Sequence, residues 1–183
     1  MQSYLSTFSN KKDIKKDMSV SMSQGNRYVL ISALPFVVVL FAIYIYRWGW
    51  QHFLIGISDL SRHPILCLMS YFAGLIVHEL IHGLTWRFLG NKPSSAIKYG
   101  VNWKALMLYA HCKEPMDVGA YKLGVAMPGV LLGLLPAFLG ILTSNSLFLT
   151  FGLFFTLVAG GDILILWLLR KVEAGMLVED HPT

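Results

Sequence analysis

Three residues in the middle of an apolar segment have the types and the spacing of a metal site. His78, Glu79 and His82 stand in the order His-Glu-x-x-His, within the run GLIVHELIHG. On an α-helix, residues four apart share one face, so the two imidazoles can bind a single ion while the intervening carboxylate acts on a water molecule. The pattern predicts Zn²⁺ held by His78 and His82, with Glu79 as the general base of a hydrolytic reaction.

A catalytic zinc site usually has a third protein ligand and one open position. The four apolar segments described below contain only two carboxylates, Glu79 and Asp162. His82 and Asp162 each lie seven or eight residues before the end of a segment, so helices would place both about 10–12 Å from the same membrane surface. Asp162 is therefore the preferred third ligand. Four residues of the loop before the third segment remain as alternatives: His111, Cys112, Glu114 and Asp117.

The elements that must position these residues are apolar segments of membrane-spanning length. Of the 183 residues, 55% are hydrophobic and 14% are charged, against about 45–50% and about 25% in ordinary soluble domains. Each segment approaches the ~20 residues that a helix needs to cross a bilayer, and none has the alternation of a barrel strand. The expected fold is an all-α membrane protein with four transmembrane helices, at about residues 28–46, 64–89, 121–142 and 147–169.

The basic residues predict how these helices are oriented. Of the 15 Lys and Arg residues, only Arg47 and Arg62 fall outside three regions: the N-terminal tail, residues 87–122 and the C-terminal end. Lys and Arg collect on the cytoplasmic side of membrane proteins, so both termini are expected in the cytoplasm. This accounts for the net charge of +5 without nucleic acid as a partner. The domains expected are a basic tail (1–27), a membrane domain (28–171) and a C-terminal tail (172–183).

The loop between the second and third segments is expected to form a short β-hairpin. Its strands would be Ala96–Tyr99 and Val101–His111, with the turn at Gly100. An extended substrate peptide could add to such a hairpin as a further strand. In the third segment, Pro128-Gly129 predicts a kink that opens space beside the metal.

The residues resemble two related groups of proteins. His78, Glu79 and His82 in an apolar helix, followed by Asp162, are similar to the site-2 protease class of intramembrane zinc metallopeptidases. The run His111-Cys112-Lys113-Glu114-Pro115, the Pro-bearing third segment and Gly160-Gly161-Asp162-Ile163 resemble more closely the putative zincin peptidase family of small bacterial membrane proteins. This resemblance covers about residues 60–170. It implies that His78, His82 and Asp162 bind zinc and that Glu79 is the general base. Site-2 proteases carry Leu-Asp-Gly where this chain has Gly161-Asp162-Ile163.

The expected function is that of a multi-pass metalloendopeptidase of the bacterial inner membrane, acting on membrane-protein or peptide substrates. Two other classes of protein fit the same metal ligands: a transporter or metal-handling protein whose site is not hydrolytic, and an inactive scaffold that binds a membrane partner. The absence of a recognisable repeat disfavours a transport fold. The two cysteines, Cys67 and Cys112, are expected to be free thiols.

Overall fold

The computed structural model describes residues 4–8, 22–103 and 107–181, and most of these residues are helical. Three helical stretches are long and apolar enough to cross a membrane: Leu30–Trp48, Pro64–Phe88 and Val118–Thr143. A bent pair of shorter helices would make a fourth span. The prediction of a largely helical chain with apolar segments of spanning length is confirmed, while the number of spans and the side of each terminus stay predictions.

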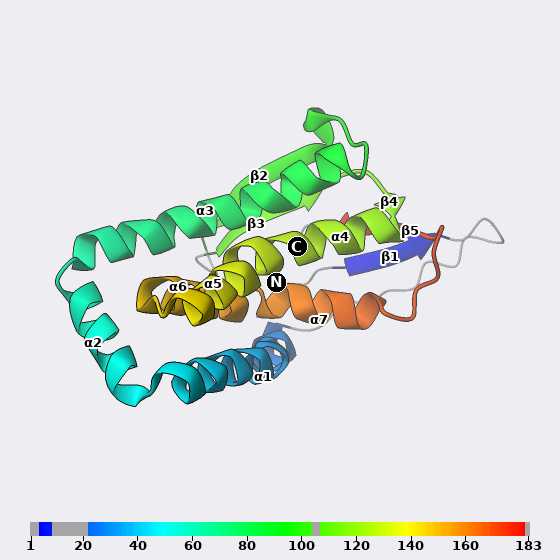
Figure 1. Ribbon diagram of the computed structural model, residues 1–183. Helices are drawn as coiled ribbons and strands as arrows, with labels where there is room; N and C mark the ends of the chain where they lie inside the picture. Colours follow the sequence, from blue (N-terminus) through cyan, green and yellow to red (C-terminus); the bar gives the residue numbers. More distant parts are fainter. Residues whose placement is uncertain (1–3, 9–21, 104–106, 182–183) are drawn as a thin grey trace.

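The helices keep the predicted order but are more divided than expected. Figure 1 shows α1 and α3 as long single helices, whereas the third segment contains a π-helical part and the fourth segment is two helices. The helices are α1 (Met22–Trp48), α2 (Trp50–Ser61), α3 (Pro64–Phe88), α4 (Val118–Pro128), η2 (Gly129–Leu134), α5 (Leu135–Thr143), α6 (Ser146–Val158) and α7 (Gly160–Leu169). Helix α2, which joins α1 to α3, was not predicted.

The predicted hairpin exists, but its turn is elsewhere. After a single 3-10 turn, η1 (Ser94–Ala96), strands β2 (Ile97–Asn102) and β3 (Met107–Cys112) pair antiparallel. The expected turn at Gly100 is wrong, because Gly100 lies inside β2 opposite Tyr109. A side chain at this position would collide with the Tyr109 ring, so the glycine serves packing within the sheet.

The two segments expected to be tails each contribute a strand to a second sheet. Strand β5 (Leu177–His181) pairs antiparallel with both β1 (Tyr4–Phe8) and β4 (Met116–Asp117), which gives the order β1-β5-β4. Figure 1 shows this sheet at the end of the molecule where α4 begins and α7 ends. Sequence periodicity does not reveal pairing between strands so far apart in the chain.

The main hydrophobic core lies at this end and ties the site-bearing elements together. Its buried residues come from α3, η1, β3, β4, α4, α7 and β5, and they include Trp86, Cys112, Met116, Val118, Leu169 and Val178. A smaller cluster around Tyr44, Ile141 and Leu149 lies among α1, α5 and α6. The first core holds the C-terminal part of α3 against α4 and α7, and the predicted metal ligands lie on α3 and α7.

Candidate metal centre

The two histidines lie on the inward face of α3. His78 and His82 are only 4% and 6% exposed, and their ring centroids are 4.9 Å apart. The next residue of this face, Trp86, stacks on His82 at 5.5 Å. The outward-facing residues of α3 are apolar. The polar groups of this inward face therefore have to find their hydrogen-bond or metal partners within the protein.

Asp162 reaches the histidines because the fourth apolar segment is broken. Helices α6 and α7 meet at a bend of 47°, and Asp162 lies in the first turn of α7. The partial positive charge at a helix N-terminus favours a carboxylate there. Its Oδ2 lies 3.2 Å from His78 Nε2, and its Oδ1 lies 3.4 Å from His82 Nε2. The structure thus brings the three predicted ligands together from two helices.

These distances fit a tetrahedral zinc ion. With ligand bonds of about 2.0–2.1 Å, two ligand atoms of a tetrahedron lie about 3.3 Å apart. Asp162 Oδ2 is buried and has no hydrogen-bond partner among the described residues, although His78 Nε2 is close by. Asp162 Oδ2 and His78 Nε2 thus face each other without a hydrogen bond between them, as two ligand atoms of one cation would.

The other nitrogen of His82 is fixed by helix α4. His82 Nδ1 lies 2.9 Å from the Gly124 carbonyl oxygen. A carbonyl can only accept a hydrogen bond, so Nδ1 carries a proton, and Nε2 is the nitrogen that faces Asp162 and is left to bind a metal ion. Gly124 is required at this position because a side chain there would collide with the Trp86 indole. His78 Nδ1, by contrast, is buried with no hydrogen-bond partner in the described part of the chain.

Glu79 lies near strand β3 of the hairpin. Its carboxylate is grouped with the two imidazoles, since one ligand atom from each of the three residues lies within 4.8 Å of the others. That proximity would also suit a ligand. Asp162, however, contacts both imidazoles directly, whereas the Glu79 carboxylate lies near the backbone of Ala110 in β3. We therefore assign Asp162 as the third-ligand candidate and Glu79 as the base candidate.

A tyrosine that the motif did not reveal covers the helix next to Glu79. The Tyr99 hydroxyl of β2 packs against Gly83, where any side chain would collide with its ring. Gly83 is one helical turn after Glu79, so both lie on the hairpin-facing side of α3. Burial raises the pKa of Tyr99, and the nearby Glu79 carboxylate raises it further. Tyr99 is therefore protonated at neutral pH; the sequence signal for this contact was the glycine that follows His82.

The alternative ligands from the loop are placed differently. Asp117 caps α4, where its Oδ1 accepts hydrogen bonds from the backbone N–H groups of Gly119 and Ala120. Glu114 forms an ion pair with Lys92 at 3.4 Å, and Cys112 is buried in the main core. His111 is buried in β3.

The expected kink at Pro128-Gly129 has another form. Helix α4 ends at Pro128 and continues as the π-helical segment η2. A side chain at Gly129 would come within 3.1 Å of the Ala159 side chain, at the break between α6 and α7. The glycine thus lets the third segment pack against the break that precedes Asp162. Gly161, beside Asp162, has no neighbour within 4 Å of where a side chain would begin.

One of the comparisons with known proteins gives a match. A family model described as Putative zincin peptidase matches residues 71–177, which is more than half of the chain. The matched region runs from α3 into β5 and contains His78, Glu79, His82 and Asp162. No curated protein and no solved structure matches the chain.

Proposed function

Because the chain belongs to the Putative zincin peptidase family, we propose that it is a membrane-embedded zinc metallopeptidase. The observation that carries the proposal is the convergence of His78 Nε2, His82 Nε2 and the Asp162 carboxylate at separations of 3.2 and 3.4 Å. With Glu79 beside them, the set has three ligands and a base, as in a catalytic zinc site.

The proposed reaction is hydrolysis of a peptide bond. A bound zinc ion would polarise the scissile carbonyl and lower the pKa of a water molecule. His78, His82 and Asp162 hold the ion, and the Gly124 carbonyl keeps the His82 ring in the tautomer that can do so. Glu79 accepts the proton of the attacking water and donates it to the nitrogen of the leaving amine. Its carboxylate is then restored.

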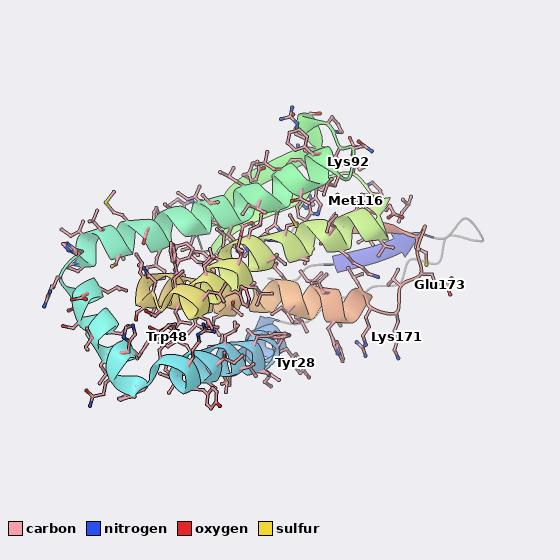
Figure 2. The ribbon with its side chains drawn as sticks, in the orientation of Figure 1. Tyr28, Trp48, Lys92, Met116, Lys171 and Glu173 are labelled. Atoms are coloured by element: carbon pink, nitrogen blue, oxygen red, sulfur yellow. The ribbon has the colours of Figure 1, made fainter. Side chains whose placement is uncertain are left out.

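The protein is proposed to lie in a bacterial inner membrane, with its site open toward the cytoplasm. Figure 2 places Lys92 and Lys171 at the end of the molecule that carries the strands, and Trp48, next to Arg47, at the opposite end. Lys and Arg residues favour the cytoplasmic side. The hairpin and the metal ligands lie toward the lysine-bearing end, so water and substrate would enter from there.

The substrate is proposed to be a membrane-associated protein or peptide in an extended conformation. The β2–β3 sheet packs on α3 beside Glu79, and within the described residues no strand pairs with the outer edge of β3. An unpaired edge can bind an extended peptide through backbone hydrogen bonds, which also presents each carbonyl in turn. This edge supports peptide hydrolysis over transport of the metal alone.

The proposal is tested by zinc analysis and by one conservative substitution. Purified protein should contain about one zinc per chain, and Glu79→Gln should retain that zinc while losing hydrolysis of membrane-protein substrates. Proteomic comparison of wild-type and Glu79→Gln cells identifies the substrates. If the purified protein contains no stoichiometric zinc, the proposed enzymatic function is refuted. If it contains zinc, and Glu79→Gln changes metal affinity or flux without changing any protein fragment in the proteomic comparison, the protein handles metal instead.

A further inference from the structure

The first turn of α7 has little of its own that would hold Asp162 in place. The helix begins with Gly160 and Gly161, and only proline favours a helix less than glycine does. Ala159 at the N-cap position supplies no side-chain hydrogen bond to the helix. The Asp162 carboxylate faces the two histidines of α3. Its position therefore has to be set by contacts from other elements.

One such contact comes from α1, whose beginning lies beside α7 (Figure 1). The Ser32 hydroxyl of α1 donates a hydrogen bond to the Gly160 carbonyl oxygen at 2.8 Å. Gly160 is buried, and so is Ala33, the residue after Ser32, so this part of α1 packs against the protein. In apolar surroundings no water replaces a hydrogen bond that a carbonyl loses, so the contact fixes the two helices to each other.

The Gly160 carbonyl is closely coupled to the position of Asp162. It belongs to the peptide unit that joins Gly160 to Gly161, and Asp162 is the next residue. Because a peptide unit is planar, a hydrogen bond to its oxygen orients the whole unit. Gly161 is conformationally permissive, and no atom lies within 4 Å of where its side chain would begin. The orientation fixed at Gly160 is thus a main restraint on the residue that follows Gly161.

We propose that Ser32 is a positioning residue of the metal centre: its hydroxyl holds the Gly160 peptide unit, which directs the Asp162 carboxylate toward the two histidines. This inference rests on the proposed function. It makes α1 a part of the site, although α1 lies outside the matched residues 71–177. Ser32 acts through the backbone and not as a ligand, so its effect on metal affinity is that of one hydrogen bond, about two- to tenfold.

The first test compares two hydroxyl groups of α1 by the dissociation constant of Zn²⁺ for the full-length protein. Ser32→Ala should weaken zinc binding by about two- to tenfold, and Ser32→Thr, which keeps a hydroxyl, should restore it. Tyr44→Phe is the matched control. The buried Tyr44 hydroxyl donates to the Ser144 carbonyl at 3.1 Å and lies 2.9 Å from Ser146 Oγ.

The control hydroxyl also joins α1 to the rest of the protein, but about 18 Å further along the helix. Tyr44→Phe should therefore leave zinc affinity unchanged. If Ser32→Ala binds zinc as tightly as the wild type, the inference is overturned. It is also overturned if both variants lose affinity equally, because the effect is then a general loosening of α1.

The second test determines whether Ser32 acts through Asp162. Ser32→Ala is introduced into the wild type and into Asp162→Ala, and zinc affinity is measured in each background. If Ser32 serves to position Asp162, its removal has no effect once Asp162 is absent. An equal loss in both backgrounds contradicts the inference. The absorption bands of the Co²⁺-loaded protein, which depend on coordination geometry, should change in Ser32→Ala and not in Tyr44→Phe.

The third test needs no metal ion. The Ile163 N–H donates to the Ala159 carbonyl at 2.9 Å, in the first turn of α7. Ser32→Ala should increase amide hydrogen exchange at Ile163 by about two- to tenfold. Leu149 is the internal control, because its N–H donates to the Asn145 carbonyl at 3.1 Å in the first turn of α6, and its exchange should not change.

Failure of the proposed function gives a different pattern from failure of this inference. If the wild-type protein binds neither Zn²⁺ nor Co²⁺, the enzymatic proposal fails and the positioning role fails with it. If the wild type binds zinc and Ser32→Ala binds it equally well, the peptidase proposal stands and the positioning role alone is refuted. A rise in exchange at Ile163 without a change in zinc affinity has the same meaning, because Ser32 then stabilises α7 without positioning Asp162.

Discussion

Asp162 Oδ1 lies 3.4 Å from His82 Nε2, although one residue belongs to α7 and the other to α3. The contact depends on the 47° bend between α6 and α7, which places Asp162 in the first turn of a new helix. It also depends on the Gly124 carbonyl of α4, which accepts a hydrogen bond from His82 Nδ1 and so turns Nε2 toward Asp162. The candidate metal centre therefore depends on three helices.

Removal of Asp162 should release the metal. Asp162→Ala is expected to lower zinc affinity by more than about 100-fold, because loss of even an outer partner of a ligand costs about 10–100-fold. Zinc content after dialysis measures this. Asp59→Ala is the control, because Asp59 is an exposed partner of Arg62 at 3.2 Å and such pairs add little stability. Equal zinc retention in both variants would remove Asp162 from the ligand set.

A methyl group at Gly124 should disturb the metal site through Trp86. Gly124→Ala collides with the indole and separates α4 from α3, and His82 then loses its carbonyl partner. We expect a loss of about 1–3 kcal/mol in the free energy of unfolding and of about tenfold or more in zinc affinity. Gly161→Ala is the matched control. It adds the same methyl group beside Asp162 but into open space, so zinc affinity should not change.

Gly83 should be needed for docking of the hairpin on α3. Gly83→Ala collides with the Tyr99 ring and with the Ile97 side chain, 2.7 Å from the new carbon. Amide exchange in β2 and β3 should rise, while exchange in the α5–α6 pair stays unchanged. Adding Tyr99→Ala removes the larger of the two collisions and should partly restore protection. If the single variant exchanges like wild type, the hairpin is not held at this contact.

The pKa of Tyr99 should report the charges on both sides of Gly83. The Glu79 carboxylate raises this pKa and the Arg87 guanidinium lowers it, so Glu79→Gln should decrease it and Arg87→Gln should increase it. Because the folded pKa is above the usual value, docking that depends on the neutral hydroxyl is complete below about pH 10 and is lost as pH rises through the folded value. Titration of the Tyr99 ring carbon by NMR measures both shifts. Shifts of the same sign would contradict the arrangement.

The apolar helices and the pairing of His78 with His82 could be predicted from local sequence. Apolar segments of spanning length predict helices, and four-residue spacing places His78 and His82 on one face, because both effects depend only on helix geometry. Counting residues from the segment ends gave Asp162 the same depth as His82. Only the tertiary structure supplied the break before Asp162, the Gly124 carbonyl behind His82 and the Tyr99 contact with α3. These features depend on backbone groups and on close packing between elements that are distant in the chain. Every residue type has backbone groups, so sequence patterns do not reveal such contacts.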